Sequence, residues 1–221
     1  VNACEDDSVI GVTGAILPLW KDEPMDWFPS EFDWILSCSN FSAITERREV
    51  RNVWGTNMSF KREAFDSGSL FLTHLGAKGG GESGKHELVG DETELSIRVR
   101  RMTGKGIIYD PHIIVQHKVY KYRVTSVFIA RRAYWEGYTK AMFNRSYRSN
   151  SGERLLSVET SLLRRILTRL LPSILIGFFR NPIIAWHRLR VTATALSSVA
   201  VGYLSYSISS PFNRQKARIG D

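Results

Sequence analysis

Short blocks of hydrophobic residues alternate with polar ones in the first half of the chain, and they predict strands. Residues 9–17 form an apolar run rich in β-branched side chains, closed by Pro18, as expected of a buried strand. Residues 50–60 approach a second strand that turns at positions 55–57. Two further apolar runs predict strands at 106–109 and 112–117.

Other blocks have helical spacing. The clearest is 92–103, and we expect a longer helix over 124–143. A short helix is predicted from Ser30, with Ser30 as its N-cap, and another over 61–72. In the helix at 92–103, one face carries the apolar side chains Leu95, Val99 and Met102, and another carries Arg98 and Arg101. The many glycines of residues 76–90 predict a loop.

The pattern changes beyond residue 144, where a polar stretch precedes two apolar segments. The segment 166–179 is interrupted by charge and proline, and 191–208 has no charged residue. The second reaches the lower length limit of a spanning helix, and the first suits an interfacial helix. A helical hairpin packed on the domain remains an alternative. The expected divisions are 1–145 (α/β domain), 146–160 (polar linker), 161–210 (membrane-associated helices) and 211–221 (basic tail).

Composition narrows the class of protein. The 221 residues are 43% hydrophobic and carry a net charge of +8, which indicates a globular protein with an anionic partner. The sequence has no nucleic-acid-binding motif, and its basic residues lie beside apolar segments, so we expect no nucleic acid partner. The two cysteines, Cys4 and Cys38, form no metal-binding pair and are interpreted as buried free thiols.

One glycine-rich stretch is close to a phosphate-binding loop. Residues 79–86 read GGGESGKH, but His86 stands where that loop needs a hydroxyl for magnesium. A loop that closes over substrate is the better interpretation.

An acidic cluster begins the predicted helix at 92–103. Asp91, Glu92 and Glu94 there have two interpretations. They complement the helix dipole, or one of them is a general base that the dipole keeps ionised.

Three motifs in order resemble the second half of family 2 glycosyltransferases. They are GTNMSFKR at 55–62, GDETELSIR at 90–98, and YDPHIIVQH at 109–117. The stretch 27–34, WFPSEFDW, resembles the polyprenyl- and dolichyl-phosphate-linked members of that family. The resemblance covers roughly residues 1–143. It implies the acceptor-side half of a GT-A (Rossmann-like) α/β domain, and an enzyme that inverts configuration at the transferred sugar.

The resemblance also implies roles for individual residues. Glu92 is the expected catalytic base, although Asp91 competes for that role because the order Asp-Glu replaces the family's usual Glu-Asp. The expected acceptor-binding residues are Trp54, Gly55, Thr56, Asn57 and Trp34. Arg123 and Arg132 are candidates for the diphosphate. His117 is a candidate metal ligand, with a structural role as the alternative. Arg131 and Trp135 are further candidates, for diphosphate and sugar, and a solvated basic helix is the alternative for Trp135 and all of these arginines.

The family's Asp-x-Asp metal motif does not occur in the sequence. We therefore expect an N-terminally truncated chain, inactive alone, whose complete enzyme uses a divalent metal (Mg or Mn). The implied partners are a nucleotide sugar donor, a polyprenyl phosphate or lipid-linked glycan acceptor, and a membrane, with the catalytic domain cytoplasmic. The alternative is a non-catalytic membrane-bound module that binds glycan or lipid phosphate.

Overall fold

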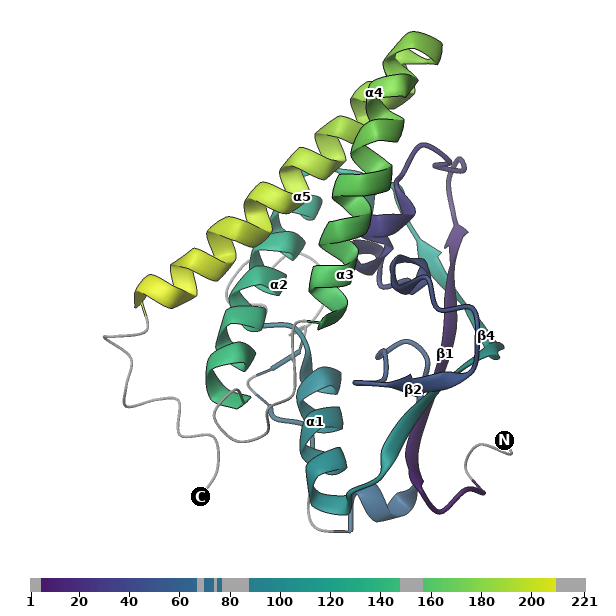
Figure 1. Cartoon of the computed structure of the whole chain (residues 1–221), viewed down its shortest axis with the longest axis vertical. Coiled ribbons are helices and arrows are strands. Elements are labelled where there is room, and N and C mark those ends of the chain that lie inside the picture. The colour runs from purple at the N-terminus through teal and green to yellow at the C-terminus, as the bar shows by residue number, and fades with distance from the viewer. Residues whose placement is uncertain (1–4, 67–69, 74, 77–87, 148–156, 210–221) are drawn as a thin grey trace.

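The computed structural model describes residues 5–66, 70–73, 75–76, 88–147 and 157–209. It is a mixed α/β structure in which a small sheet and one helix form one side and the C-terminal helices the other (Figure 1). The strands are β1 (Val9–Trp20), β2 (Arg48–Val50), β3 (Met58–Phe60) and β4 (Gly106–Val119). The α-helices are α1 (Asp91–Thr103), α2 (Ser126–Tyr147), α3 (Ser157–Arg165), α4 (Leu171–Arg180) and α5 (Pro182–Ser209). A π-helical stretch, η6 (Ile166–Leu170), joins α3 to α4, and the 3₁₀ helices are η2 (Ser30–Leu36), η3 (Asn40–Ser42), η4 (Arg62–Ala64) and η5 (Lys121–Val124).

The sheet has the strand order β2-β4-β1-β3, with the two long strands parallel at its centre. The outer strands β2 and β3 are short and antiparallel to their neighbours. The two strands predicted at 106–109 and 112–117 are one strand, β4, which bulges between Asp110 and Ile114. Gly14 makes room for the bulge, because a Cβ there would lie 2.0 Å from the Ile113 carbonyl oxygen.

The helices at 92–103 and 124–143 are confirmed as α1 and α2, which begin and end within a few residues of the predicted limits. Ser30 as N-cap is wrong: Pro29 precedes η2 and no side chain caps it. Of the helix predicted at 61–72, the described residues form only the single turn η4. Met102 is exposed, because it lies at the solvent end of α1 and not in its buried face. Helix α2 continues to Tyr147, so helical structure extends into the expected linker.

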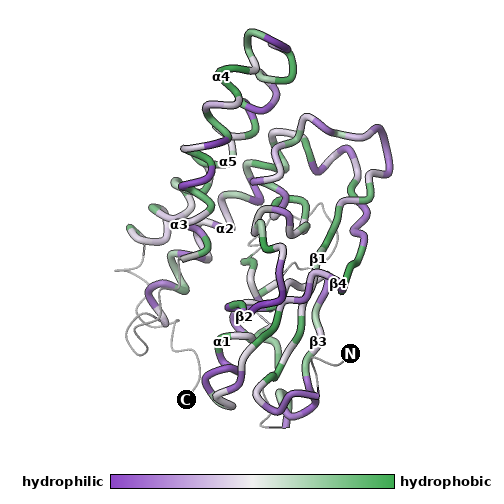
Figure 2. Tube along the Cα trace, turned by 45° about the vertical axis from the view of Figure 1, so that its right-hand side comes forward, coloured by the Kyte–Doolittle hydropathy of each residue, from purple (hydrophilic) through white to green (hydrophobic). Residues whose placement is uncertain are grey.

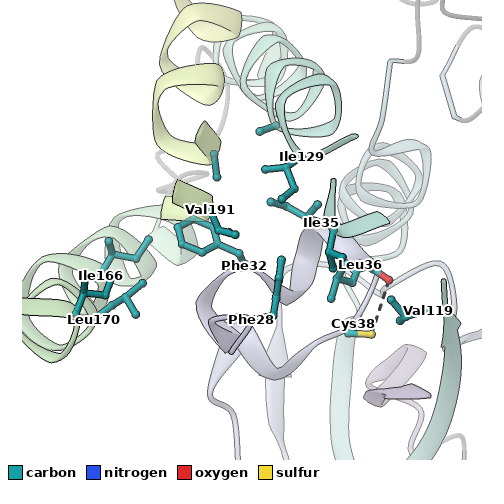
Figure 3. Packing of buried hydrophobic residues seen from close by; sticks show 14 of the residues in the cluster. Phe28, Phe32, Ile35, Leu36, Cys38, Val119, Ile129, Ile166, Leu170 and Val191 are labelled. Carbon is teal, nitrogen blue, oxygen red and sulfur yellow. Dashed lines mark hydrogen bonds between the residues drawn. The ribbon is translucent and has the colours of Figure 1, made fainter. Parts of the chain in front are cut away.

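The larger of the hydrophobic clusters joins the sheet to the C-terminal helices. Phe32 of η2, Ile129 of α2 and Val191 of α5 converge in it, and Ile166 and Leu170 reach it from η6 (Figure 3). Cys38 is buried in the same cluster, as expected of a free thiol, and burial raises its pKa to about 12. Cys4 and the glycine-rich stretch 79–86 lie outside the described residues.

Helix α5 packs along α2, and the two run in the same direction (Figure 1). Their backbones touch at two glycines. A Cβ on Gly137 would lie 2.1 Å from the Val199 carbonyl oxygen, and one on Gly202 would lie 2.0 Å from that of Tyr134. Side chains of any size are therefore excluded at both positions.

In the described part of the chain, α5 is the one helix long and apolar enough to cross a membrane. Helix α5 begins nine residues before the apolar segment 191–208. That segment is the part of the helix that lies along α2. The small sheet, the helix between its parallel strands and the apolar C-terminal helix are consistent with a partial GT-A domain.

Candidate functional site

The candidate site is built around the first turn of α1. Gly90 precedes the helix with a φ of 87°, a left-handed conformation that favours glycine. Asp91 and Glu92 follow as its first residues, next to the unpaired backbone N–H groups of the helix N-terminus. The dipole of α1 therefore favours negative charge at this place.

A buried serine holds this turn against the segment before the predicted acceptor turn. Ser96 Oγ donates to the Glu92 carbonyl at 2.6 Å and accepts a hydrogen bond from the Val53 backbone N–H at 3.2 Å. Both Ser96 and Val53 are fully buried. The position of Glu92 relative to residues 54–57 is thus fixed by hydrogen bonds through protein atoms.

The turn from Trp54 to Asn57 is itself closed from beneath by Thr13 of β1. The Thr13 hydroxyl donates to the Asn57 carbonyl at 2.6 Å and accepts from the Trp54 N–H at 3.3 Å. The Asn57 side-chain amide donates to the carbonyls of Ala15 and Ile113, across the bulge of β4. Asn57 therefore fixes the turn and the bulge together, whatever else it contacts.

Glu92 faces the middle of this turn. Its carboxyl carbon lies 3.8 Å from the point that a Cβ on Gly55 would occupy. Gly55 and Thr56 are exposed and Trp54 is partly buried, with its ring edge-to-face against Tyr109. A carboxylate and an exposed turn with an aromatic side chain thus lie side by side.

The electrostatic surroundings leave Glu92 ready to accept a proton near neutrality. Burial, followed by the hydrogen bond and charge of Asp91, outweighs the helix dipole and raises the pKa of Glu92 to about 7, so the expectation that the dipole keeps this base fully ionised is wrong. The positive charge of Arg132 on α2 acts in the opposite direction. Asp91 lies beside Gly76, where a Cβ would come within 3.0 Å of its Oδ2. A carboxylate with a pKa near the working pH is suited to general-base chemistry.

Glu94 does not face the site and is part of a buried hydrogen-bond cluster. Its carboxylate is fully buried, accepts two hydrogen bonds of 2.9 Å from Arg98, and accepts one of 2.9 Å from the Tyr147 hydroxyl. Burial and the nearby Glu94 charge raise the pKa of Tyr147. This side chain anchors α1 to the end of α2, so of the acidic cluster only Asp91 and Glu92 face the site.

The two arginines predicted to bind diphosphate lie in different groups. Arg132 acts on Glu92, and it pairs with Glu136 at 3.4 Å. Arg123 is instead near His117 and Cys38, donates to the Leu36 carbonyl, and lies over the rings of Tyr122 and Phe128.

His117 lies near the C-terminal end of β4. Its Nε2 is buried and has no hydrogen-bond partner in the structure. Burial, with the charge of Arg123, lowers the pKa of His117, which keeps the ring neutral and able to bind a metal. Within the described ranges, however, no three His, Cys, Asp or Glu side chains gather as a metal site needs. These residues therefore offer one candidate ligand and do not by themselves hold a divalent metal.

The two remaining aromatic candidates lie on helices. Trp34 belongs to η2 and, like Trp54, borders the large hydrophobic cluster, with its buried Nε1 lacking a partner. Trp135 lies on α2 edge-to-face with Tyr134 and Tyr138.

Two residues that position the site were not predicted. Thr13 lies inside an apolar strand and Ser96 inside an apolar helical face, and both are fully buried. A small polar residue among apolar ones is a weak sequence signal. Its partners, the backbone N–H groups of Trp54 and Val53, are known only from the fold.

Comparison with known proteins identifies one relative. The chain is 30% identical over 161 residues to the glucosyl-dolichyl phosphate glucuronosyltransferase of Haloferax volcanii. The match covers 73% of this chain, which spans half the length of that relative. No family model and no solved structure matches the chain. The predicted resemblance to dolichyl-phosphate-linked sugar transferases is confirmed.

Proposed function

We propose that this chain forms the acceptor side of an inverting glycosyltransferase that moves a sugar from a nucleotide sugar to a polyprenyl phosphate or a lipid-linked glycan. The observation that carries the proposal is Glu92, whose pKa of about 7 and position opposite Gly55 suit a base that faces an acceptor. The similarity to a dolichyl phosphate-linked glucuronosyltransferase supports the substrate class.

In this proposal the acceptor glycan lies over the turn from Trp54 to Asn57. Glu92 takes the proton from its hydroxyl, and the oxygen attacks the anomeric carbon from the face opposite the departing diphosphate. Asp91 keeps the affinity of Glu92 for that proton high. Arg132, which acts on Glu92 from α2, balances negative charge that develops nearby. Arg123 is the second cation assigned to the diphosphate.

A divalent metal, Mg or Mn, belongs to the proposal for the complete enzyme. In family 2 enzymes such a metal neutralises the leaving diphosphate. His117 is the residue of this chain that would contact it, through Nε2. The remaining ligands would come from outside the described residues, so no step here depends on the metal.

The competing proposal is a non-catalytic module that binds glycan or lipid phosphate at a membrane. The lack of an Asp-x-Asp triplet in these 221 residues favours it for this chain by itself. In both proposals the protein is membrane-associated, with the site on the cytoplasmic side.

The experiment uses a hybrid in which this chain replaces the matching half of the Haloferax volcanii relative. Glucuronosyl transfer to glucosyl-dolichyl phosphate is measured for the hybrid, for Glu92→Gln and for Glu46→Gln, an exposed acid changed in the same way. Loss of a general base lowers kcat by about 10²–10⁴ while donor binding stays nearly normal.

Glu46→Gln should leave kcat unchanged. Near-normal turnover of Glu92→Gln would remove Glu92 from the role of base and direct the test to Asp91→Asn. A hybrid that binds lipid-linked glycan tightly but transfers nothing, with folded structure intact, would favour the non-catalytic module.

A further inference from the structure

The turn between α4 and α5 projects from one end of the molecule. Both helices extend past the sheet and the start of α2 to reach it (Figure 1). We call residues 175–186, which include this turn, the hairpin tip. Around it, hydrophobic and hydrophilic residues follow one another closely (Figure 2).

The hairpin tip exposes large apolar side chains. Phe179 is 93% exposed, Ile183 70% and Trp186 57%. Leu175 and Ile176 are more than half exposed as well. A cluster of this kind at a protruding end marks an interaction surface, since soluble proteins seldom expose contiguous apolar groups without a use.

The charged side chains of the hairpin segment itself all have one sign. Between residues 160 and 209 the chain has no Asp, Glu or Lys, and its arginines are Arg164, Arg165, Arg169, Arg180, Arg188 and Arg190. Arg180 and Arg190 are exposed; in the sequence, Arg180 lies between Phe179 and Ile183, and Arg190 follows Trp186. Aromatic and aliphatic side chains between arginines match the two layers of an anionic membrane surface, in which headgroups lie above acyl chains.

The rest of α5 is packed against another helix. From about Val191 onward it lies along α2, with backbone contact at Gly137 and Gly202 and a hydrogen bond from Asn144 to the Tyr203 hydroxyl at 3.1 Å. Helix α2 carries the partly buried, ion-paired side chains Arg132, Glu136 and Lys140. A bilayer that surrounded this part of α5 would also have to take in those charges, which is costly.

The base of the hairpin is fixed to the folded domain. Arg188 donates to the backbone carbonyls of Trp27 and Asp26, and His187 packs against the Trp27 ring at 5.0 Å. The tip is therefore carried rigidly beyond the domain, before α5 meets α2.

We propose that the hairpin tip inserts into one leaflet of an anionic membrane, with Phe179, Ile183 and Trp186 among the acyl chains and Arg180 and Arg190 at the headgroups, while the rest of α5 stays packed on α2. The protein then lies on the membrane and does not span it. The inference rests on the proposed membrane association. It replaces insertion of residues 191–208 with insertion of the tip.

Helix α5 provides its own matched control. Val201, Leu204 and Ile208, near its other end, are 54%, 57% and 73% exposed, which is close to the values at Ile183 and Trp186. We compare two triple variants of the full chain, Phe179→Ser/Ile183→Ser/Trp186→Ser and Val201→Ser/Leu204→Ser/Ile208→Ser. All six side chains are exposed, so both variants should keep the far-ultraviolet circular dichroism of the parent chain.

Binding is measured by co-sedimentation with vesicles of phosphatidylcholine plus phosphatidylglycerol, and with phosphatidylcholine alone. The tip variant should bind the mixed vesicles about tenfold more weakly or worse, because it loses the buried apolar area, and the control variant should bind as the parent does. Equal weakening by both variants would mean that α5 inserts along its length, and no weakening by either would mean that the tip is not the contact. Either result overturns the proposal.

A second measurement reports depth. An environment-sensitive fluorophore is attached to Phe179→Cys or to Ile208→Cys in a Cys4→Ser chain, since Cys38 is buried and unreactive. Vesicles should shift the emission to the blue at position 179 and leave position 208 unchanged. A blue shift at both positions would contradict the proposal. These assays contain no sugar donor, so their failure says nothing about catalysis, and a failed transfer assay says nothing about the tip.

Discussion

The first turn of α1 and the contact between α2 and α5 are held in place by opposite means. Around α1, polar side chains determine the geometry: Ser96 bridges to Val53, Glu94 binds Arg98, and Thr13 closes the turn that Glu92 faces. Between α2 and α5 the backbones meet at glycines, and the contact depends on the absence of side chains. Hydrogen bonds fix the backbone that carries the Glu92 carboxylate, whereas close packing only keeps two helices together.

One ion-pair cluster connects the two regions. Glu159 of α3 pairs with Lys140 of α2 at 2.9 Å and with Arg51, just before the buried Val53, at 3.2 Å. Lys140 also pairs with Glu136, which binds Arg132. A continuous series of charges thus runs from α3 to the arginine that acts on Glu92. We expect three substitutions in these regions to change the free energy of unfolding by successively smaller amounts.

The largest effect is expected where the two helices touch. Gly202→Ala should lower the free energy of unfolding by about 3 kcal/mol, because the new Cβ would lie 2.0 Å from the Tyr134 carbonyl oxygen and the backbones must separate. Urea unfolding of the full chain measures the change.

Gly177→Ala is the matched control, since it is also a helical glycine but its Cβ would meet only the Ala185 methyl group at 3.3 Å. Both variants gain the helix propensity of alanine, so their difference reports the clash. If Gly202→Ala were as stable as Gly177→Ala, α2 and α5 would not be in backbone contact.

The sequence predicted the elements with strong periodicity and missed those that depend on neighbours. The strand from Val9 and the helix that begins at Asp91 follow from their own residues. The continuity of β4 does not follow from its own residues, because the Asn57 side-chain amide, which lies just before β3, holds the bulge of β4 through the Ile113 carbonyl. Similarly, the apolar segment 191–208 covers only part of α5, because the helix begins at Pro182 and includes Arg188 and Arg190.

In the candidate site, the sequence motif assigned Glu92 and the 54–57 turn to one site, with Asp91 as the rival base, but the residues alone could not separate the roles of the three neighbouring acids. Glu94 differs from Glu92 because Tyr147, 53 residues later, reaches its carboxylate. Only tertiary contacts distinguish a buried anchor from a group that faces the site. The roles assigned to all the site residues, Glu92 and the 54–57 turn as well as Arg123, Arg132, Trp34 and His117, stay predictions.

A middle-sized effect is expected at the connecting cluster. Although burial alone would raise it, the charges of Lys140 and Arg51 lower the pKa of Glu159 to about 2. Glu159→Gln should therefore cost about 2 kcal/mol at neutral pH, because two cations lose their partner. The ion pairs contribute fully above the unfolded pKa near 4.5, and the contribution is lost as pH falls toward 2.

The difference between Glu159→Gln and the parent chain should consequently shrink in urea unfolding below pH 4.5. Glu46→Gln, an exposed acid, should change stability by less than about 0.5 kcal/mol at any pH. A Glu159 variant with unchanged stability at neutral pH would show that α3 is not held by this cluster.

The smallest expected change in stability is a gain, and it distinguishes Glu92 from the neighbouring residues that stabilise α1. The pKa of Glu92 is raised to about 7, so the folded chain keeps a proton that the unfolded chain releases near pH 4.5. Stability therefore falls as pH rises from about 4.5 to 7, and the charged carboxylate is unfavourable above that range. Glu92→Gln removes this charge and should stabilise the chain by about 1 kcal/mol at pH 8, with almost no gain at pH 4.

Glu94→Gln, two residues away, should destabilise the chain at both pH values because Arg98 and Tyr147 lose their acceptor. Thermal unfolding at pH 8 and pH 4 measures both variants. A loss of stability for Glu92→Gln at pH 8 would make Glu92 another anchor of α1. The contrast between a site residue whose charge destabilises the fold and neighbours that stabilise it would then not hold.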